Sequence, residues 1–127
     1  MEYSNMITFS EKTDVTVTAI LREIGVPANI KGYPYLRKAI LMTITDMSII
    51  GAVTKILYPD VAKYYQTNAL CVEHAIRRAI EIAWKRGDIR ILQKYFGDSI
   101  LVHNRKPTNS EFIATIADTL RLREMQM

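Results

Sequence analysis

The chain has 127 residues, of which 49% are hydrophobic and 24% charged, and its net charge is +4. This length is enough for one domain that buries a sizeable core without a metal or a disulfide, and the composition is that of a globular protein rather than a disordered one. No apolar run approaches the ~20 residues that a membrane span requires, and the N-terminus lacks a signal-peptide pattern. The single cysteine, Cys71, cannot form an internal disulfide, so we expect a cytoplasmic protein with no membrane partner.

The first helix is predicted to follow a tail. Residues 1–12 show no sustained periodicity, and we expect an N-terminal tail over residues 1–13. The helix is predicted from Thr13 or Asp14 to about Ile24, where Gly25 ends it. Its apolar side carries Ala19, Ile20, Leu21 and Ile24. The alternating segment VTVT favours a strand instead, but the helical period continues through AILREIG and no partner strand follows, so we predict a helix.

Three further helices are predicted before the middle of the chain. One is expected from about Tyr33 to Thr45, with apolar residues at spacings of three and four. Asp46 or Ser48 is expected to cap the next helix. The apolar face of that helix carries Ile49, Ile50, Val53, Ile56 and Leu57. Pro59 suits the first turn of a third, short helix, which contains Val61, Ala62 and Tyr65.

A long helix follows a break at residues 66–68 and is predicted to run to about Lys85, where Gly87 closes it. Val72 lies ten residues after Ala62, the offset at which a helix-turn-helix packs its two helices across the turn. The short and the long helix together therefore predict a helix-turn-helix, whose second helix usually enters a DNA groove.

The end of the chain predicts two more helices. A short amphipathic helix ends at Gly97, and residues 98–107 form a connection in which SILVH resembles a strand without a partner. Thr108 and Glu111 have the spacing of a capping box, so a last helix is expected to begin there and to run to about Leu122. The sequence therefore predicts an all-α fold, a compact bundle of about six helices over residues 14–127 that contains a helix-turn-helix.

The long helix has two contrasting faces when its residues are placed at about 100° intervals. The side expected to face the preceding helices carries Val72, Ala75, Ile76, Ala79 and Ala83. The opposite side carries Leu70, Glu73, His74, Arg77 and Glu81, with Cys71 and Arg78 on one shoulder. Because Arg pairs with guanine and Glu accepts from cytosine, this second face is a candidate base-reading surface. Residues 63–106 also hold nine basic and four acidic side chains, so the positive charge is concentrated around this helix.

Four segments of the chain carry a resemblance to a known family. They are REIGVPANIKGYPYLRKAI (residues 22–40), VTKILYPDVAKYY (residues 53–65), VEHAIRRAIEIAW (residues 72–84) and KPTNSEFIATIADTLRL (residues 106–122). In one register they closely resemble the DNA-binding effector domain of the stage-zero sporulation response regulator of endospore-forming bacteria. The resemblance covers about residues 15–122. It implies a domain of about six helices and sequence-specific binding to promoter boxes of the TGTCGAA type. It also implies head-to-tail homodimers on paired boxes and contact with the sigma subunit of RNA polymerase.

The resemblance also shows where this chain departs from its family. The family recognition helix resembles TTASRVERAIRHAIEVAW, and the corresponding segment here is TNALCVEHAIRRAIEIAW, residues 67–84. Glu73 and Arg77 match. Leu70 stands in place of serine, Cys71 in place of an arginine that reads guanine in the family, and His74 in place of the next arginine. Arg78 replaces a histidine and restores one positive charge. We therefore expect an altered recognition helix on a retained scaffold.

The candidate contacts with double-stranded DNA fall into two groups. Those expected to face base edges are Glu73, His74, Arg77, Arg78, Leu70 and Cys71. Those expected to hold the DNA backbone are Thr67, Asn68, Lys63, Lys85, Arg86 and Lys106. The family places a phosphorylated receiver domain ahead of this domain, and only a short segment precedes the resemblance here. The chain is then either a stand-alone relative outside phosphorelay control or a piece of a longer protein, and the starting Met1 favours the first.

The sequence contains few signals of a metal site or an enzyme. Cys71 and His74 have no second Cys/His pair, whereas a structural zinc site takes four ligands. No Gly-rich phosphate loop, paired carboxylates or Ser/His/Asp set appears, so we expect no enzyme, no metal, no cofactor and no small-molecule substrate. One alternative stays open: a protein-interaction module that pairs with a full-length family member and has lost specific DNA binding. Exposed Leu70 and the missing arginines favour that alternative.

Overall fold

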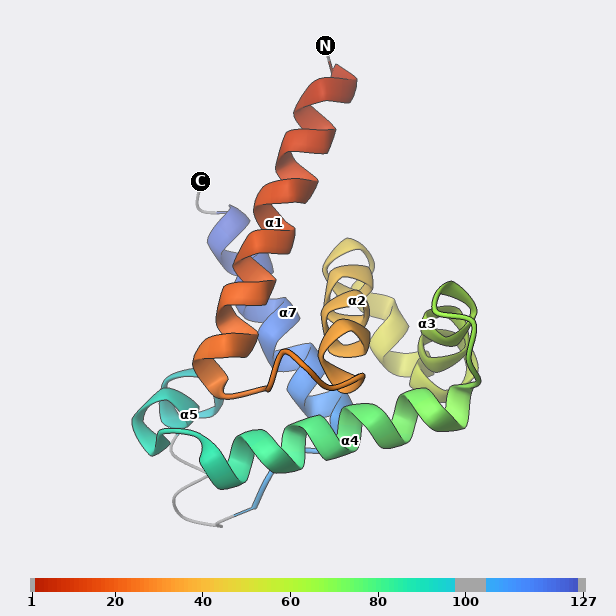
Figure 1. Cartoon of the computed structure of the whole chain (residues 1–127). Helices are drawn as coiled ribbons and strands as arrows, with labels where there is room; N and C mark the ends of the chain where they lie inside the picture. The colour runs from red at the N-terminus through yellow and green to blue at the C-terminus, as the bar shows by residue number, and fades with distance from the viewer. Residues whose placement is uncertain (1, 98–104, 126–127) are drawn as a thin grey trace.

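The structure is a computed structural model, which describes residues 2–97 and 105–125 of the backbone, and side chains within residues 12–97 and 105–123. Its elements are α1 (Glu2–Ile24), α2 (Gly32–Thr45), η1 (Met47–Ala52), η2 (Val53–Leu57), α3 (Tyr58–Tyr64), α4 (Ala69–Arg86), α5 (Ile89–Phe96) and α7 (Asn109–Met125) (Figure 1). Every regular element in these ranges is helical, which confirms the predicted all-α fold. The SILVH segment of the predicted connection, residues 99–103, lies outside the described residues.

α1 is longer than predicted. It begins at Glu2, so the predicted helix start at Thr13 or Asp14 was wrong, because no Gly or Pro precedes Gly25 to interrupt the helix. Its end was predicted correctly, since Gly25 has a φ of +108°. Val17, Ile20, Leu21 and Ile24 are buried. Ala19, predicted on the apolar side, is exposed, and Val17 takes its place in the core. The division of the chain at residue 13 stays a prediction.

α2 is the central helix and packs against α1, α4 and α7. Seven of its residues are buried: Gly32, Tyr33, Tyr35, Leu36, Ala39, Ile40 and Thr43. Gly32 is the point of closest approach to α4, because a Cβ added there would lie 2.3 Å from the Ala75 carbonyl oxygen. Only glycine lets the two backbones come this close. The start of α2 thereby supports the buried side of α4.

The single helix predicted after Asp46 is two distorted pieces, the 3₁₀ segment η1 and the π segment η2. Asp46 is the cap, since its carboxylate accepts a hydrogen bond from the Ser48 amide at 3.0 Å. Ala52, with φ −138° and ψ 42°, breaks the α geometry between the pieces. As a result Val53 and Leu57 are buried, whereas Ile56, predicted on the same apolar face, is 44% exposed.

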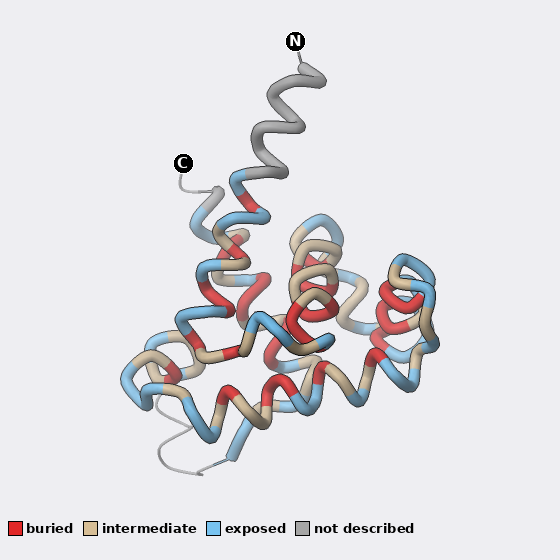
Figure 2. The backbone as a smooth tube through the Cα atoms, in the orientation of Figure 1, coloured by how far each residue is buried: buried red, intermediate tan, exposed pale blue. Residues whose placement is uncertain are grey.

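α4 lies across one end of the other helices, and Figure 2 shows its buried residues on the side that faces them. At the C-terminal end of α4, three aromatic side chains pack against one another. The Trp84 and Phe96 ring centroids lie 5.1 Å apart, and those of Phe96 and Phe112 lie 5.3 Å apart.

α7 begins with the predicted capping box. The Thr108 amide donates to the Glu111 carboxylate at 2.9 Å, and the Glu111 amide donates to the Thr108 hydroxyl at 3.2 Å.

Candidate nucleic-acid interface

α3 and α4 form the predicted helix-turn-helix. Ala62 of α3 and Val72 of α4 are both buried where the two helices meet. The turn between them is fixed by Gln66, whose φ of +56° is in the left-handed region, and by the Thr67 amide, which donates to the Ala62 carbonyl at 2.9 Å. Because the turn is tight, α4 runs in a different direction from α3, and one side of α4 does not pack against the core.

Three predicted backbone contacts gather where α4 begins. Lys63 is exposed in the last turn of α3, and Thr67 and Asn68 lie in the turn. Asn68 is the N-cap of α4, with its side-chain oxygen accepting from the Cys71 amide at 2.9 Å. The start of an α-helix carries unsatisfied N–H groups and partial positive charge, which favour a phosphate.

Most of the predicted base-facing residues lie on the free side of α4. Leu70 is 65% exposed, the His74 side chain is 57% exposed and the Arg77 side chain 51%. Cys71 and Arg78 are also exposed. The opposite side was predicted nearly correctly: Val72, Ile76, Ala79 and Ala83 are buried, but Ala75 is only half-buried and Ile80, which the prediction missed, is almost fully buried.

Glu73 differs from the other predicted base-facing residues. Its side chain is 28% exposed, and its carboxylate lies 3.3 Å from His74 Nε2 and 3.6 Å from an Arg77 guanidinium nitrogen. The carboxylate therefore neutralises part of the positive charge of Arg77 and restricts where the guanidinium points. Such an exposed pair adds little stability, of the order of 0.3–0.5 kcal/mol for i,i+4 pairs on a helix, so Arg77 can exchange it for a stronger acceptor.

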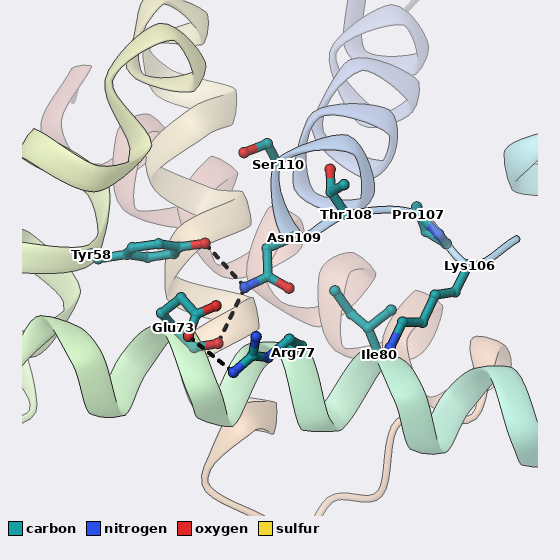
Figure 3. Close-up of a pocket in the computed structure, with 9 residues that line it drawn as sticks. All are labelled: Tyr58, Glu73, Arg77, Ile80, Lys106, Pro107, Thr108, Asn109 and Ser110. Carbon is teal, nitrogen blue, oxygen red and sulfur yellow. Dashed lines mark hydrogen bonds and ion pairs between the residues drawn. The ribbon is translucent and has the colours of Figure 1, made fainter.

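A hollow of about 350 Å³ lies between α4 and the start of α7 (Figure 3). It is lined by Tyr58, Glu73, Arg77, Ile80, Lys106, Pro107, Thr108, Asn109 and Ser110. The Asn109 amide nitrogen donates to the Tyr58 hydroxyl at 3.0 Å and to the Glu73 carbonyl at 3.2 Å. Burial raises the pKa of Tyr58, and the Asn109 hydrogen bond acts in the opposite direction. Asn109 thus ties α7 to both helices of the helix-turn-helix.

Lys106 joins the same side of α4 farther along the helix. Its ammonium lies 3.0 Å from the Glu81 carboxylate, and this hydrogen bond and charge lower the pKa of Glu81. Lys106 was predicted as a contact, but Asn109 and Tyr58 were missed. The capping box at Thr108 and Glu111 placed Asn109 at a helix start and was the signal that could have drawn attention to it.

The remaining predicted contacts, Lys85 and Arg86, lie in the last turn of α4 and are exposed. Within the described side chains, no group of three or more His, Cys, Asp or Glu residues could hold a metal ion. Among the described helices, none is both long and apolar enough to cross a membrane. The arrangement offers an exposed helix face bordered by cationic side chains, which suits binding to a polyanion.

A comparison with protein families supplies independent evidence. Residues 17–120 match the family model described as Sporulation initiation factor Spo0A C terminal. The match spans the helix-turn-helix, the α2 helix that supports it and most of α7. It agrees in extent with the resemblance seen in the sequence. The chain therefore belongs to this family of DNA-binding effector domains.

Proposed function

We propose that this protein is a sequence-specific DNA-binding transcriptional regulator. Its recognition helix, α4, binds a promoter box that differs from the TGTCGAA type of the family. The observation that carries the proposal is the free side of α4, where His74, Arg77 and Arg78 stand clear of the core. Family membership supplies the class of partner, DNA. The protein acts by occupying its site, and no covalent step is required.

Each side chain on the free side has a role that its chemistry allows. Arg77 and Arg78 are the guanidinium groups available to pair with guanine, and Glu73 is a carboxylate that can hold Arg77 or accept from cytosine N4. Leu70 can touch a thymine methyl group. Cys71 cannot replace the bidentate guanine contact of the arginine found in the family, a loss of about 1–3 kcal/mol of discrimination. The preferred box should therefore differ from the TGTCGAA type or be read less strictly.

Two protein partners belong to the same proposal. A second copy of this chain is expected on paired boxes, and the sigma subunit of RNA polymerase is expected to contact the segment of residues 87–100. That segment contains α5, whose Arg90 side chain is 86% exposed. Both partners rest on the resemblance and are tested by crosslinking on a box-bearing duplex with and without the sigma subunit.

The first measurement is fluorescence anisotropy with a duplex that carries paired TGTCGAA-type boxes and with a scrambled duplex, over a salt series. Tenfold or greater preference for the boxes, with affinity that falls as salt rises, means that the family box is still read. Equal affinity for both duplexes calls for a selection from random sequences. A selection that yields no enriched box would contradict sequence-specific binding.

Arg77→Ala separates this proposal from the protein-interaction alternative, which is motivated by the exposure of Leu70. Removing the guanidinium should reduce the preference for the selected box by about tenfold or more, since a good bidentate pair contributes about 1–3 kcal/mol. Lys12→Ala is the control, because it removes one positive charge from an exposed position on α1. If Arg77→Ala and Lys12→Ala bind the box equally well, Arg77 does not read bases. If Arg77→Ala leaves binding to a full-length family member intact while the wild type prefers no duplex, the interaction module is the better description.

A further inference from the structure

Two segments of the chain border α4 on opposite sides. One is residues 105–109, which carry Lys106 and Asn109 onto the side of Glu73 and Glu81. The other is residues 25–32, which we call the 25–32 flank. It meets α4 at Ala75, where Gly32 leaves no room for a side chain, and again just past the C-terminal end of α4, where a Cβ added to Gly25 would lie 3.6 Å from the Gly87 Cα. Figure 1 shows this segment running along α4 between α1 and α2.

The 25–32 flank gathers cations from three elements. Arg22 of α1 and Arg86 of α4 line one open hollow of about 610 Å³ together with residues 25–29. Lys31 directly precedes Gly32 and is exposed. Arg78 projects from α4 on the shoulder next to Ala75, as its position about 60° from Ala75 around the helix requires. These four side chains come from distant parts of the sequence and are brought to one side of α4 by the fold.

The two sides of α4 differ in whether their cationic side chains form ion pairs. On the 105–109 side every described cation is in an ion pair: Arg77 with Glu73, Lys106 with Glu81 and Arg105 with Glu111. On the 25–32 flank, Arg22, Lys31, Arg78 and Arg86 form no ion pair with any described carboxylate. Glu23, the acidic neighbour of Arg22 in the sequence, is engaged by Lys94 at 3.6 Å and by the Tyr95 hydroxyl.

The unpaired cations Arg22 and Arg86 line the same hollow, so they repel one another and raise the local positive potential. A polyanion relieves this repulsion and releases its own condensed counterions, so the gain in affinity is larger than for cations that must first give up a carboxylate. The DNA major groove is about 12 Å wide and admits one helix, so both sides of a helix that lies in it face sugar-phosphate backbones.

We infer that the 25–32 flank is a phosphate-binding wall, in which Arg22, Lys31 and Arg86 hold one DNA strand while α4, with Arg78 at the edge of its base-facing side, lies in the major groove. This inference rests on the proposed function and adds two contacts, Arg22 and Lys31, that lie outside the helix-turn-helix. Because phosphates are the same at every base pair, the wall supplies affinity and register and carries no base preference.

The test compares Arg22→Ala, Lys31→Ala and the double variant with the wild type, by anisotropy on both the preferred and the scrambled duplex over a salt series. Each lost phosphate contact should lower the slope of log affinity against log salt by about 0.9. The double variant should bind about ten- to a hundredfold more weakly at about 0.1 M salt on both duplexes. The ratio of the two affinities should not change.

Lys12→Ala is the matched control, because Lys12 is on the same helix as Arg22 and lies about 15 Å away along its axis. Circular dichroism should report the same fold and Tm for all variants, and Gln in place of Ala should give the same slopes. If the slopes of Arg22→Ala and Lys31→Ala equal that of Lys12→Ala, the wall is overturned and the proposed function stands. A changed preference ratio also overturns it, since the flank would then read bases. A wild type with no salt-dependent binding to any duplex overturns both.

Discussion

Replacing Asn109 with alanine removes a side chain that ties α7 to both helices of the helix-turn-helix. Its amide nitrogen donates to the Tyr58 hydroxyl and to the Glu73 carbonyl, at 3.0 and 3.2 Å. Each hydrogen bond contributes about 0.5–1.5 kcal/mol, and a buried polar group left without a partner costs about 1–3 kcal/mol. Tyr58 is only 8% exposed, so water cannot fully replace the lost donor.

The net expectation is a loss of about 2 kcal/mol in the free energy of unfolding, which lowers Tm by roughly 8 °C in a domain of this size. Urea unfolding followed by circular dichroism measures it. Ser110→Ala is the control, since Ser110 follows Asn109 in α7 and lines the same hollow. Tyr58→Phe combined with Asn109→Ala should give a coupling energy of about 1 kcal/mol. A change below 0.5 kcal/mol for Asn109→Ala, or strict additivity of the pair, would refute this account.

Two further substitutions probe the frame around the interface. Gly32→Ala should lower the free energy of unfolding by about 1–3 kcal/mol through overpacking, because the new Cβ would lie 2.3 Å from the Ala75 carbonyl oxygen. Gly51→Ala is the control, since a Cβ there would have nothing within 4 Å and should change stability little. Equal urea midpoints for the two variants would contradict the close approach at Gly32. In the capping box, the Thr108 amide lowers the pKa of Glu111, so its contribution to stability is present above its pKa in the unfolded chain and is lost as pH falls through the lowered folded pKa. The Tm advantage of wild type over Glu111→Gln should therefore shrink between neutral pH and about pH 3, and a constant difference would argue against the hydrogen bond.

Local signals in the sequence predicted the ends of most helices. Asn68 and Gly87 bound α4 as expected, and the capping box of Thr108 and Glu111 forms with both hydrogen bonds. Gly25 ends α1 with a positive φ. These features depend on residues within one turn of each other, and a short stretch of sequence contains all the information that they need.

The features that were not predicted are not specified by such short stretches of sequence. The start of α1 had no stop signal, and the tail was inferred only from weak periodicity. The change from 3₁₀ to π geometry around Ala52 follows from how Val53 and Leu57 reach the core, which no local pattern specifies. The contact of Asn109 with the Glu73 carbonyl joins residues 36 positions apart, and its existence depends on the packing of α7 against the rest of the bundle.

The two parts of the candidate interface, the free side of α4 and the 25–32 flank, also differ in whether nearby residues in the sequence are enough to predict them. The free side of α4 could be predicted from one helix, and the resemblance implies that Leu70 and Cys71 stand there in place of a serine and an arginine. The 25–32 flank could not, because the fold brings Arg22 and Arg86 to one hollow and places Lys31 directly before the close approach at Gly32. If the flank supplies affinity and the free side supplies preference, substitutions on α4 can change the box without removing the protein from DNA. An altered recognition helix on an unchanged scaffold is then compatible with DNA binding, and the salt slope and the preference ratio measure the two contributions separately.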